Sequence, residues 1–128
     1  MIKTFKNKKI LVTGGTGTFG SFFIENFIRE HDDFKKIIIF SRDEFKQFNL
    51  KKKLQNNKNF KKIRFFIGDI RDKNRVDTAF KNVNVIIHTA ALKQIDTAEY
   101  NPTEYINTNI NGSKNVIENA IHNNISKV

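Results

Sequence analysis

The chain has 128 residues, enough for one domain with a hydrophobic core but short for an enzyme that must bind a dinucleotide and a substrate. Hydrophobic residues make up 38% and charged residues 28%, a balance typical of globular proteins, and no stretch approaches the roughly 18 apolar residues of a membrane span. Cysteine is absent, which excludes disulfides and cysteine-based zinc sites and suits a reducing compartment; we expect a cytoplasmic protein without a bound metal.

The formal net charge of +10 is spread along the chain. Its densest part is Lys51–Lys53 with Lys58, Lys61 and Lys62, where we expect a helix end and a loop in solvent. A solvated surface therefore fits this charge better than a polyanion site, and we expect no nucleic-acid partner. Submicromolar DNA binding near physiological salt would contradict that expectation.

A first strand is predicted over 9–13, and a glycine-rich turn follows it directly. The spacing matches both G-x-G-x-x-G and G-x-x-G-x-x-G, with glycines at Gly14, Gly15, Gly17 and Gly20. Such glycines permit a tight bend and a close approach to a pyrophosphate, while the next helix directs free amides and its positive dipole end at the phosphates. Strand, turn and helix together predict a dinucleotide-binding site. The alternative is a glycine turn with a structural role only.

The segments that follow alternate between helix and strand. A helix is expected from about Phe19 to Glu30, and Phe19, Phe23 and Phe27 at i, i+4 spacing are predicted to be buried on the sheet. The apolar run Ile37–Phe40 is typical of a parallel strand covered on both faces.

A polar helix is predicted from Glu44 to Gln55, with Phe45 and Phe48 turned inward, and a loop follows over 56–59. A third strand is expected over 63–67, and a short helix is marked by the apolar residues of 76–80.

A fourth strand is predicted over 83–88, and a loop follows it. A helix then starts with Asn101 as N-cap, Pro102 at the first helical position and Glu104 reaching back to the cap. This helix is expected to run to about Asn123, with one face formed by Ile106, Ile110, Ser113, Ile117 and Ile121.

Four strands alternating with four helices predict an α/β fold, a Rossmann-like doubly wound parallel sheet with right-handed crossovers and strand order 3-2-1-4. The order reverses between the first and fourth strands. Ligands bind such sheets at that switch point, beyond the carboxyl ends of the strands. The four loops that follow the strands are therefore expected to converge on one cleft.

The end of the second strand indicates which cofactor binds there. An acidic residue at this position usually accepts the ribose hydroxyls of NAD, whereas a basic residue accommodates the extra phosphate of NADP. The chain has Ser41 and Arg42, and Lys46 follows one helical turn later as a second cation. NADP is therefore favoured over NAD. The alternative is that Arg42 pairs with Asp43 or Glu44.

At the end of the third strand, Asp69 is expected to face the adenine edge, with Ile70 packed on the ring. A turn-capping role is the alternative for Asp69.

Five segments resemble one enzyme family. They are residues 13–20 (T-G-G-T-G-T-F-G), 41–47 (S-R-D-E-F-K-Q), 64–72 (R-F-F-I-G-D-I-R-D), 88–94 (H-T-A-A-L-K-Q) and 99–102 (E-Y-N-P) with 108–110 (T-N-I). In these the chain resembles the extended short-chain dehydrogenase/reductases, in particular the CapD-like polysaccharide biosynthesis branch that includes inverting UDP-N-acetylglucosamine 4,6-dehydratases. Thr89 departs from the alanine that is usual in that family.

The resemblance implies an NADP site, a UDP-sugar substrate and a homo-oligomeric parent enzyme. Lys93 would reach the sugar nucleotide as well as the cofactor, with a solvated loop lysine as the alternative. The complete set of predicted cofactor-binding residues is Gly14, Thr16, Gly17, Thr18, Phe19, Gly20, Ser41, Arg42, Asp43, Lys46, Asp69, Ile70, Ala90, Ala91 and Lys93.

Catalysis in the family needs acid and base groups, which it takes from a segment after the fifth strand and from a Tyr-x-x-x-Lys pair. Neither is present: Glu104 stands four positions after Tyr100, and Asn109 four positions after Tyr105. We therefore assign no catalytic residue and expect an incomplete Rossmann domain over 1–128, ending before strand five and inactive alone. A UDP-sugar 4-epimerase portion and a non-catalytic NADP-binding protein are the alternatives.

Overall fold

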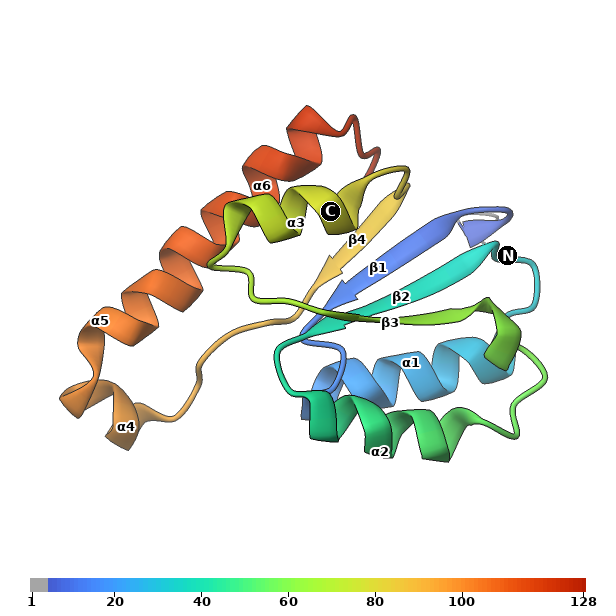
Figure 1. Ribbon diagram of the computed structural model, residues 1–128, viewed down its shortest axis with the longest axis horizontal. Coiled ribbons are helices and arrows are strands. Elements are labelled where there is room, and N and C mark those ends of the chain that lie inside the picture. Colours follow the sequence, from blue (N-terminus) through green and yellow to red (C-terminus); the bar gives the residue numbers. More distant parts are fainter. Residues whose placement is uncertain (1–4) are drawn as a thin grey trace.

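The computed structural model describes residues 5–128; the first four residues of the predicted domain lie outside the described part. Four parallel strands form one sheet in the order β3-β2-β1-β4, which confirms the predicted order. They are β1 (Lys9–Thr13), β2 (Lys36–Ser41), β3 (Ile63–Ile67) and β4 (Val85–His88). Figure 1 shows α1 (Thr18–Glu30) and α2 (Glu44–Leu54) on one face of the sheet, with α3 (Lys73–Phe80) and α6 (Ser113–His122) on the other.

The central positions of the strands are mostly apolar because both faces of the sheet are covered. Side chains alternate along β1: Ile10 and Val12 join the core beneath α1 and α2, whereas Leu11 joins the core beneath α3 and α6. Ile24 and Val116, from the covering helices, are fully buried in these two cores. This packing fixes the sheet, whose carboxyl ends carry the glycine turn and the loops after β2, β3 and β4.

In α1, burial follows only part of the predicted phenylalanine stripe. Phe27 is buried and Phe23 partly buried, as expected, but Phe19 is 57% exposed, so its predicted burial on the sheet is wrong. The helix begins at Thr18, immediately beyond the turn that follows β1. The first turn therefore projects past the carboxyl edge of the sheet, where no core lies beneath it.

In α2, the predicted inward-facing residues are also wrong. Phe45 is 71% exposed and Phe48 51% exposed, whereas Gln47, Leu50 and Leu54 are buried. Gln47 fixes this rotation because its Nε2 donates to the Ser41 Oγ at 3.0 Å and to a main-chain oxygen of β3 at 3.2 Å. A polar residue thus occupies the inner face that hydrophobicity alone assigns to phenylalanine.

The region after β4 contains more helix than expected. A short helix, α4 (Ile95–Tyr100), occupies the predicted loop, and α5 (Pro102–Tyr105) continues without a break through a π-helical segment, η3 (Ile106–Gly112), into α6. Figure 1 shows α4 and α5 extending away from the sheet. Pro102 takes the first helical position, as predicted, but the Asn101 side chain makes no cap hydrogen bond. Glu104 pairs with Arg71 instead of reaching back to the cap.

One face of this long helix is unpartnered in the part of the chain that the structure describes. The predicted isoleucines are exposed, namely Ile106, Ile110, Ile117 and Ile121, but Ser113, predicted on the same face, is half-buried and bonds His88. The buried residues are Thr108, Gly112, Val116, Asn119 and Ala120. Gly112 is required there because a Cβ would lie 2.7 Å from two carbons of the Ile70 side chain.

Lys127 forms a parallel bridge with Val85 of β4, at the position predicted for the start of a fifth strand. No helix within residues 5–128 combines the length and the apolar character needed to cross a bilayer.

Candidate cofactor-binding site

A cleft of about 1040 Å³ lies beyond the carboxyl ends of the strands, at the switch point between β1 and β4. Thirteen of the fifteen predicted cofactor residues line it: Gly14, Gly17, Thr18, Phe19, Gly20, Ser41, Arg42, Lys46, Asp69, Ile70, Ala90, Ala91 and Lys93. Thr16 is not among the lining residues. Asp43 is not either, because its carboxylate caps α2 by accepting from the Lys46 main-chain N–H at 2.9 Å.

The glycine turn has no room for side chains at its two ends. Gly14 has φ +65°, and a Cβ there would lie 2.7 Å from the main-chain nitrogen of Ala90. A Cβ on Gly20 would lie 2.3 Å from the Gly14 carbonyl oxygen. The turn is thus pressed against both its own helix and the loop after β4. The first turn of α1 has no acidic residue and no side-chain cap, so its free amides and dipole face the cleft unopposed.

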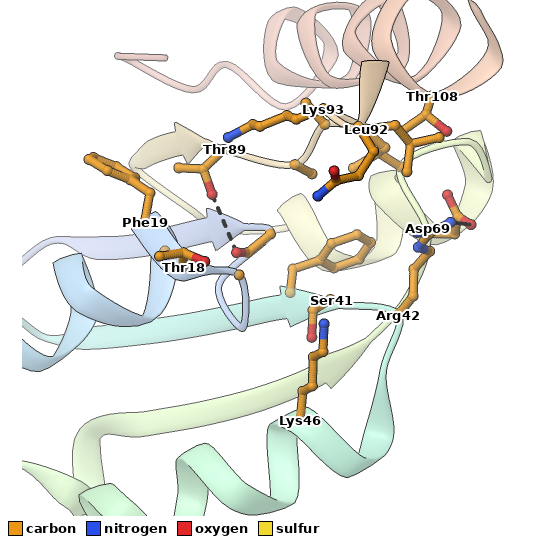
Figure 2. Close-up of a pocket in the computed structure, with 18 of the residues that line it drawn as sticks. Thr18, Phe19, Ser41, Arg42, Lys46, Asp69, Thr89, Leu92, Lys93 and Thr108 are labelled. Carbon is orange, nitrogen blue, oxygen red and sulfur yellow. Dashed lines mark hydrogen bonds and ion pairs between the residues drawn. The ribbon is translucent and has the colours of Figure 1, made fainter. Parts of the chain in front are cut away.

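Two cations and a hydroxyl line the cleft beyond the end of β2. Figure 2 shows Lys46 pointing from α2 toward Ser41, whereas Arg42 is directed toward Asp69. The side chain of Arg42 is half exposed, and its Nη1 lies 3.7 Å from the Asp69 Oδ2. The structure therefore differs from the alternative pairing of Arg42 with Asp43 or Glu44. Within the described residues, neither Asp43 nor Glu44 forms an ion pair with this guanidinium.

Asp69 is held mainly by Arg71. Its Oδ2 accepts from the Arg71 Nη2 at 2.8 Å and Nε at 3.0 Å, and its Oδ1 accepts from the Arg71 main-chain N–H at 2.9 Å. Partial burial raises the pKa of Asp69, but the hydrogen bonds and charge of Arg71, together with the charge of Arg42, outweigh it and hold the pKa below its ordinary value. Asp69 is therefore ionised at neutral pH. The hydrogen bond from the Arg71 main-chain N–H to Asp69 caps the turn after β3, which is the alternative role considered for Asp69.

A relay of polar side chains joins β1, β4 and α6 behind the cleft. The Thr13 Oγ1 lies 2.6 Å from the His88 Nδ1, and the His88 Nε2 lies 3.1 Å from the Ser113 Oγ. The Thr13 hydroxyl already accepts from the main-chain N–H groups of Thr89 at 3.1 Å and Ala90 at 3.4 Å. Its single proton is therefore left for His88, which makes Nδ1 the acceptor and Nε2 the donor to Ser113.

Burial lowers the pKa of His88, so its ring is neutral at pH 7, as this relay requires. Thr89 fits the same arrangement: its hydroxyl turns back and donates to the Thr13 main-chain oxygen at 2.7 Å. Thr89, the residue that departs from the family pattern, thus ties β4 to β1 and also lines the cleft. The other two histidines, His31 and His122, lie at the ends of α1 and α6.

Several residues of the cleft were not predicted from the sequence. The most informative is Thr108, which lines the cleft and is 5% exposed; its Oγ1 has no hydrogen-bond partner in the described residues. It lies in the π-helical segment, and such segments occur frequently at functional sites. Asn109, next to it, binds both main-chain groups of Leu92 at 2.8 and 2.9 Å and so positions the loop that carries Lys93. The sequence signal that could have indicated Thr108 and Asn109 is the family resemblance of the segment 108–110.

Residues 10–128 match the profile of a family described as polysaccharide biosynthesis protein. The chain belongs to this family. Among the curated relatives of this chain, an inverting UDP-N-acetylglucosamine 4,6-dehydratase of Campylobacter jejuni is 45% identical over 123 residues, 96% of this chain and 35% of the relative. A UDP-glucose 4-epimerase of Rickettsia bellii is 46% identical over 126 residues, 97% of this chain and 36% of the relative. The chain thus spans about a third of the length of these relatives.

Solved structures of similar proteins agree with the fold of this chain. The Pen protein of Bacillus thuringiensis superposes with a TM-score of 0.87 at 40% identity, covering 95% of this chain and 36% of that one. A dTDP-glucose 4,6-dehydratase of Streptomyces venezuelae, solved with NAD bound, has a TM-score of 0.78 at 23% identity and covers 92% of this chain and 37% of its own. The second likeness shows the shared Rossmann-like fold.

Proposed function

We propose that this chain forms the NADP-binding part of a nucleotide-sugar 4,6-dehydratase, of the UDP-N-acetylglucosamine type, that acts in the synthesis of cell-surface polysaccharides. The 45% identity to the Campylobacter enzyme over nearly the whole chain supports that substrate class. The cleft supports a dinucleotide because the glycine turn, the start of α1 and the ends of all four strands meet there. The absence of cysteine supports a reducing, cytoplasmic location.

The observation that carries the NADP assignment is the cation pair at the end of β2. Arg42 and Lys46 both line the cleft, and Lys46 points toward Ser41. An arginine fork with a neighbouring ammonium group suits a phosphate monoester, which is the group that distinguishes NADP from NAD. The acid that follows them, Asp43, is committed to capping α2 and so does not compete as an acceptor for the ribose hydroxyls.

The test is a comparison of the two cofactors. Calorimetric titration of the chain with NADP and with NAD should give tighter binding of NADP, and Arg42→Gln should abolish most of that preference. Lys46→Gln should reduce it less, since an ammonium group lacks the bidentate geometry. NAD is bound by the Streptomyces dehydratase of the same fold. Tighter binding of NAD by this chain would reject the NADP assignment and leave the dinucleotide site in place.

Lys93 is the residue that we propose for the sugar nucleotide. It lines the cleft beyond β4, and it also lines a smaller hollow beside His88, Asn109 and Ser113. A cation at this place can meet a diphosphate or a sugar hydroxyl. In the chain loaded with NADP, Lys93→Ala should weaken the binding of UDP-N-acetylglucosamine, whereas Lys81→Ala, at the end of α3, should not. If the wild type and Lys93→Ala bind UDP-N-acetylglucosamine equally well, Lys93 is a solvated lysine without a part in substrate binding.

A UDP-sugar 4-epimerase is the second candidate, because the Rickettsia relative is as similar as the dehydratase. The chain has no Tyr-x-x-x-Lys sequence, so the chain alone should convert UDP-N-acetylglucosamine to no product. A chimera separates the candidates: residues 1–128 replace the matching part of the Campylobacter dehydratase or of the Rickettsia epimerase. The dehydratase chimera should regain the larger fraction of its parent's turnover, and a larger fraction in the epimerase chimera would favour the second candidate.

A further inference from the structure

Four charged side chains form an alternating network along one wall of the cleft. Arg42 follows β2, Asp69 and Arg71 follow β3, and Glu104 lies in α5. The Nη1 of Arg71 binds the Oε2 of Glu104 at 2.6 Å, while its Nε and Nη2 bind Asp69. Arg42 touches the network only at Asp69. Of the four, Arg42, Asp69 and Glu104 line the cleft and Arg71 does not.

Asp69 is shared unequally by the two arginines. Arg71 gives it three hydrogen bonds of 2.8 to 3.0 Å, whereas the nearest nitrogen of Arg42 is 3.7 Å away, beyond hydrogen-bond distance. Arg71 therefore occupies most of the hydrogen-bond acceptor capacity of Asp69. Arg42 keeps its own donors and stays half exposed in the cleft.

We infer that Arg71 strengthens the cofactor preference of this site without touching the cofactor. It engages the Asp69 carboxylate, and this leaves Arg42 available for a phosphate monoester. The inference rests on the NADP site proposed above. Without Arg71, the Asp69 carboxylate would lose these hydrogen bonds and draw the guanidinium of Arg42 into a bidentate pair.

Glu104 provides a matched control because it binds the same guanidinium from the other side. Removing its charge leaves all three Arg71–Asp69 hydrogen bonds available, so Asp69 stays engaged. Glu104→Gln should therefore leave the preference for the 2′-phosphate within about twofold of the wild type, since exposed ion pairs contribute little. Arg71→Gln and Glu104→Gln both remove the ion pair between α5 and the end of β3, so a loss caused by loosening α5 alone would appear in both variants.

The experiment measures the ratio of two dissociation constants, for adenosine 2′,5′-bisphosphate and for adenosine 5′-phosphate, by calorimetry. Any effect of Asp69 on the adenine ring cancels in this ratio. Arg71→Gln should lower the preference for the 2′-phosphate about threefold to fivefold, the range expected for one partly exposed ion pair, while the constant for adenosine 5′-phosphate changes less than about twofold. Arg71→Lys, which keeps the charge but not the fork, should fall between Arg71→Gln and the wild type.

The double variant Arg42→Gln/Arg71→Gln decides whether Arg71 acts through Arg42. If it does, the double variant shows the same ratio as Arg42→Gln alone. An additional loss would mean that Arg71 binds the phosphate itself, and an unchanged ratio in Arg71→Gln would mean that it has no part in the preference; either result overturns the inference. A wild type without any preference for the 2′-phosphate would overturn the proposed NADP site instead, and the inference with it.

Discussion

Replacing Thr13 with valine tests the polar relay that holds the loop after β4. The two side chains have nearly the same shape, and position 13 is fully buried, so the change removes a hydroxyl and creates little space. The hydroxyl is the partner of His88 Nδ1 at 2.6 Å and of the main-chain N–H groups of Thr89 and Ala90. The consequence should be a loss of stability and a loosened cofactor wall at Ala90.

The magnitude follows from which groups lose their partner. The Thr89 N–H retains the Thr13 main-chain oxygen at 3.2 Å. The Ala90 N–H and the His88 Nδ1 have no other acceptor or donor in the described residues. An unsatisfied buried group costs about 1 to 3 kcal/mol, and both groups are only partly buried, so we expect a total near 2 to 4 kcal/mol.

The assay is urea unfolding of the 128-residue chain followed by circular dichroism at pH 7.5, with Thr13→Ser as the control. Serine keeps the hydroxyl and loses one methyl group, which costs about 1 kcal/mol. The valine variant should thus be the less stable of the two, although it is the more hydrophobic. If Thr13→Val costs no more than Thr13→Ser, the hydrogen-bond relay contributes nothing measurable and our reasoning fails.

Three further predictions address the pH response, the turn and the core. Burial lowers the pKa of His88 from 6.5, so the unfolded chain takes up its proton first; the stability that this residue contributes is present above pH 6.5 and is lost as the pH falls toward the folded pKa. The difference in unfolding free energy between the wild type and His88→Asn should shrink below that pH, and a difference independent of pH would contradict the assignment. Gly20→Ala places a Cβ 2.3 Å from a carbonyl oxygen and should destabilise the chain by about 2 kcal/mol or more, despite the helix propensity of alanine, while Gly17→Ala, with 3.2 Å to its nearest atom, should cost less; equal costs in thermal melts would be inconsistent with the turn geometry. Phe45→Ser should change the free energy of unfolding by about 0.5 kcal/mol or less, whereas Leu50→Ala should lower it by about 2 to 5 kcal/mol. A larger loss for Phe45→Ser than for Leu50→Ala would mean that Phe45 faces inward.

The sequence predicted the strands better than the helix faces, and the reason is physical. A parallel strand covered on both sides must be apolar at every position, so Ile37–Phe40 is recognisable without knowledge of its neighbours. A helix on the sheet buries only one stripe, and in α2 the rotation depends on hydrogen bonds from Gln47 to β2 and β3. One of these partners, Phe66, lies 19 positions away along the chain, so the pattern of hydrophobic residues within α2 indicated the wrong face.

The same distinction applies to the site. The glycine turn and the residues after β2 and β3 were predictable because the topology of a parallel sheet brings the carboxyl ends of its strands together. Thr108 and Glu104 were not predicted, because they reach the cleft only through the continuous path of α5, η3 and α6. A π-helical segment has no simple sequence signature, and its effect on which side chains face the cleft is visible only in three dimensions.

The contact between Gly14 and Ala90 affects any attempt to transplant the nucleotide-binding turn into another protein. Position 14 approaches the backbone of residue 90 so closely that a Cβ would lie 2.7 Å from its nitrogen. The turn therefore fits only against the backbone at Ala90, which lies 76 positions after Gly14 in the chain. A graft of residues 13–20 alone would carry the motif without its complementary surface. A designer would have to transfer the small residues after β4 together with the glycines.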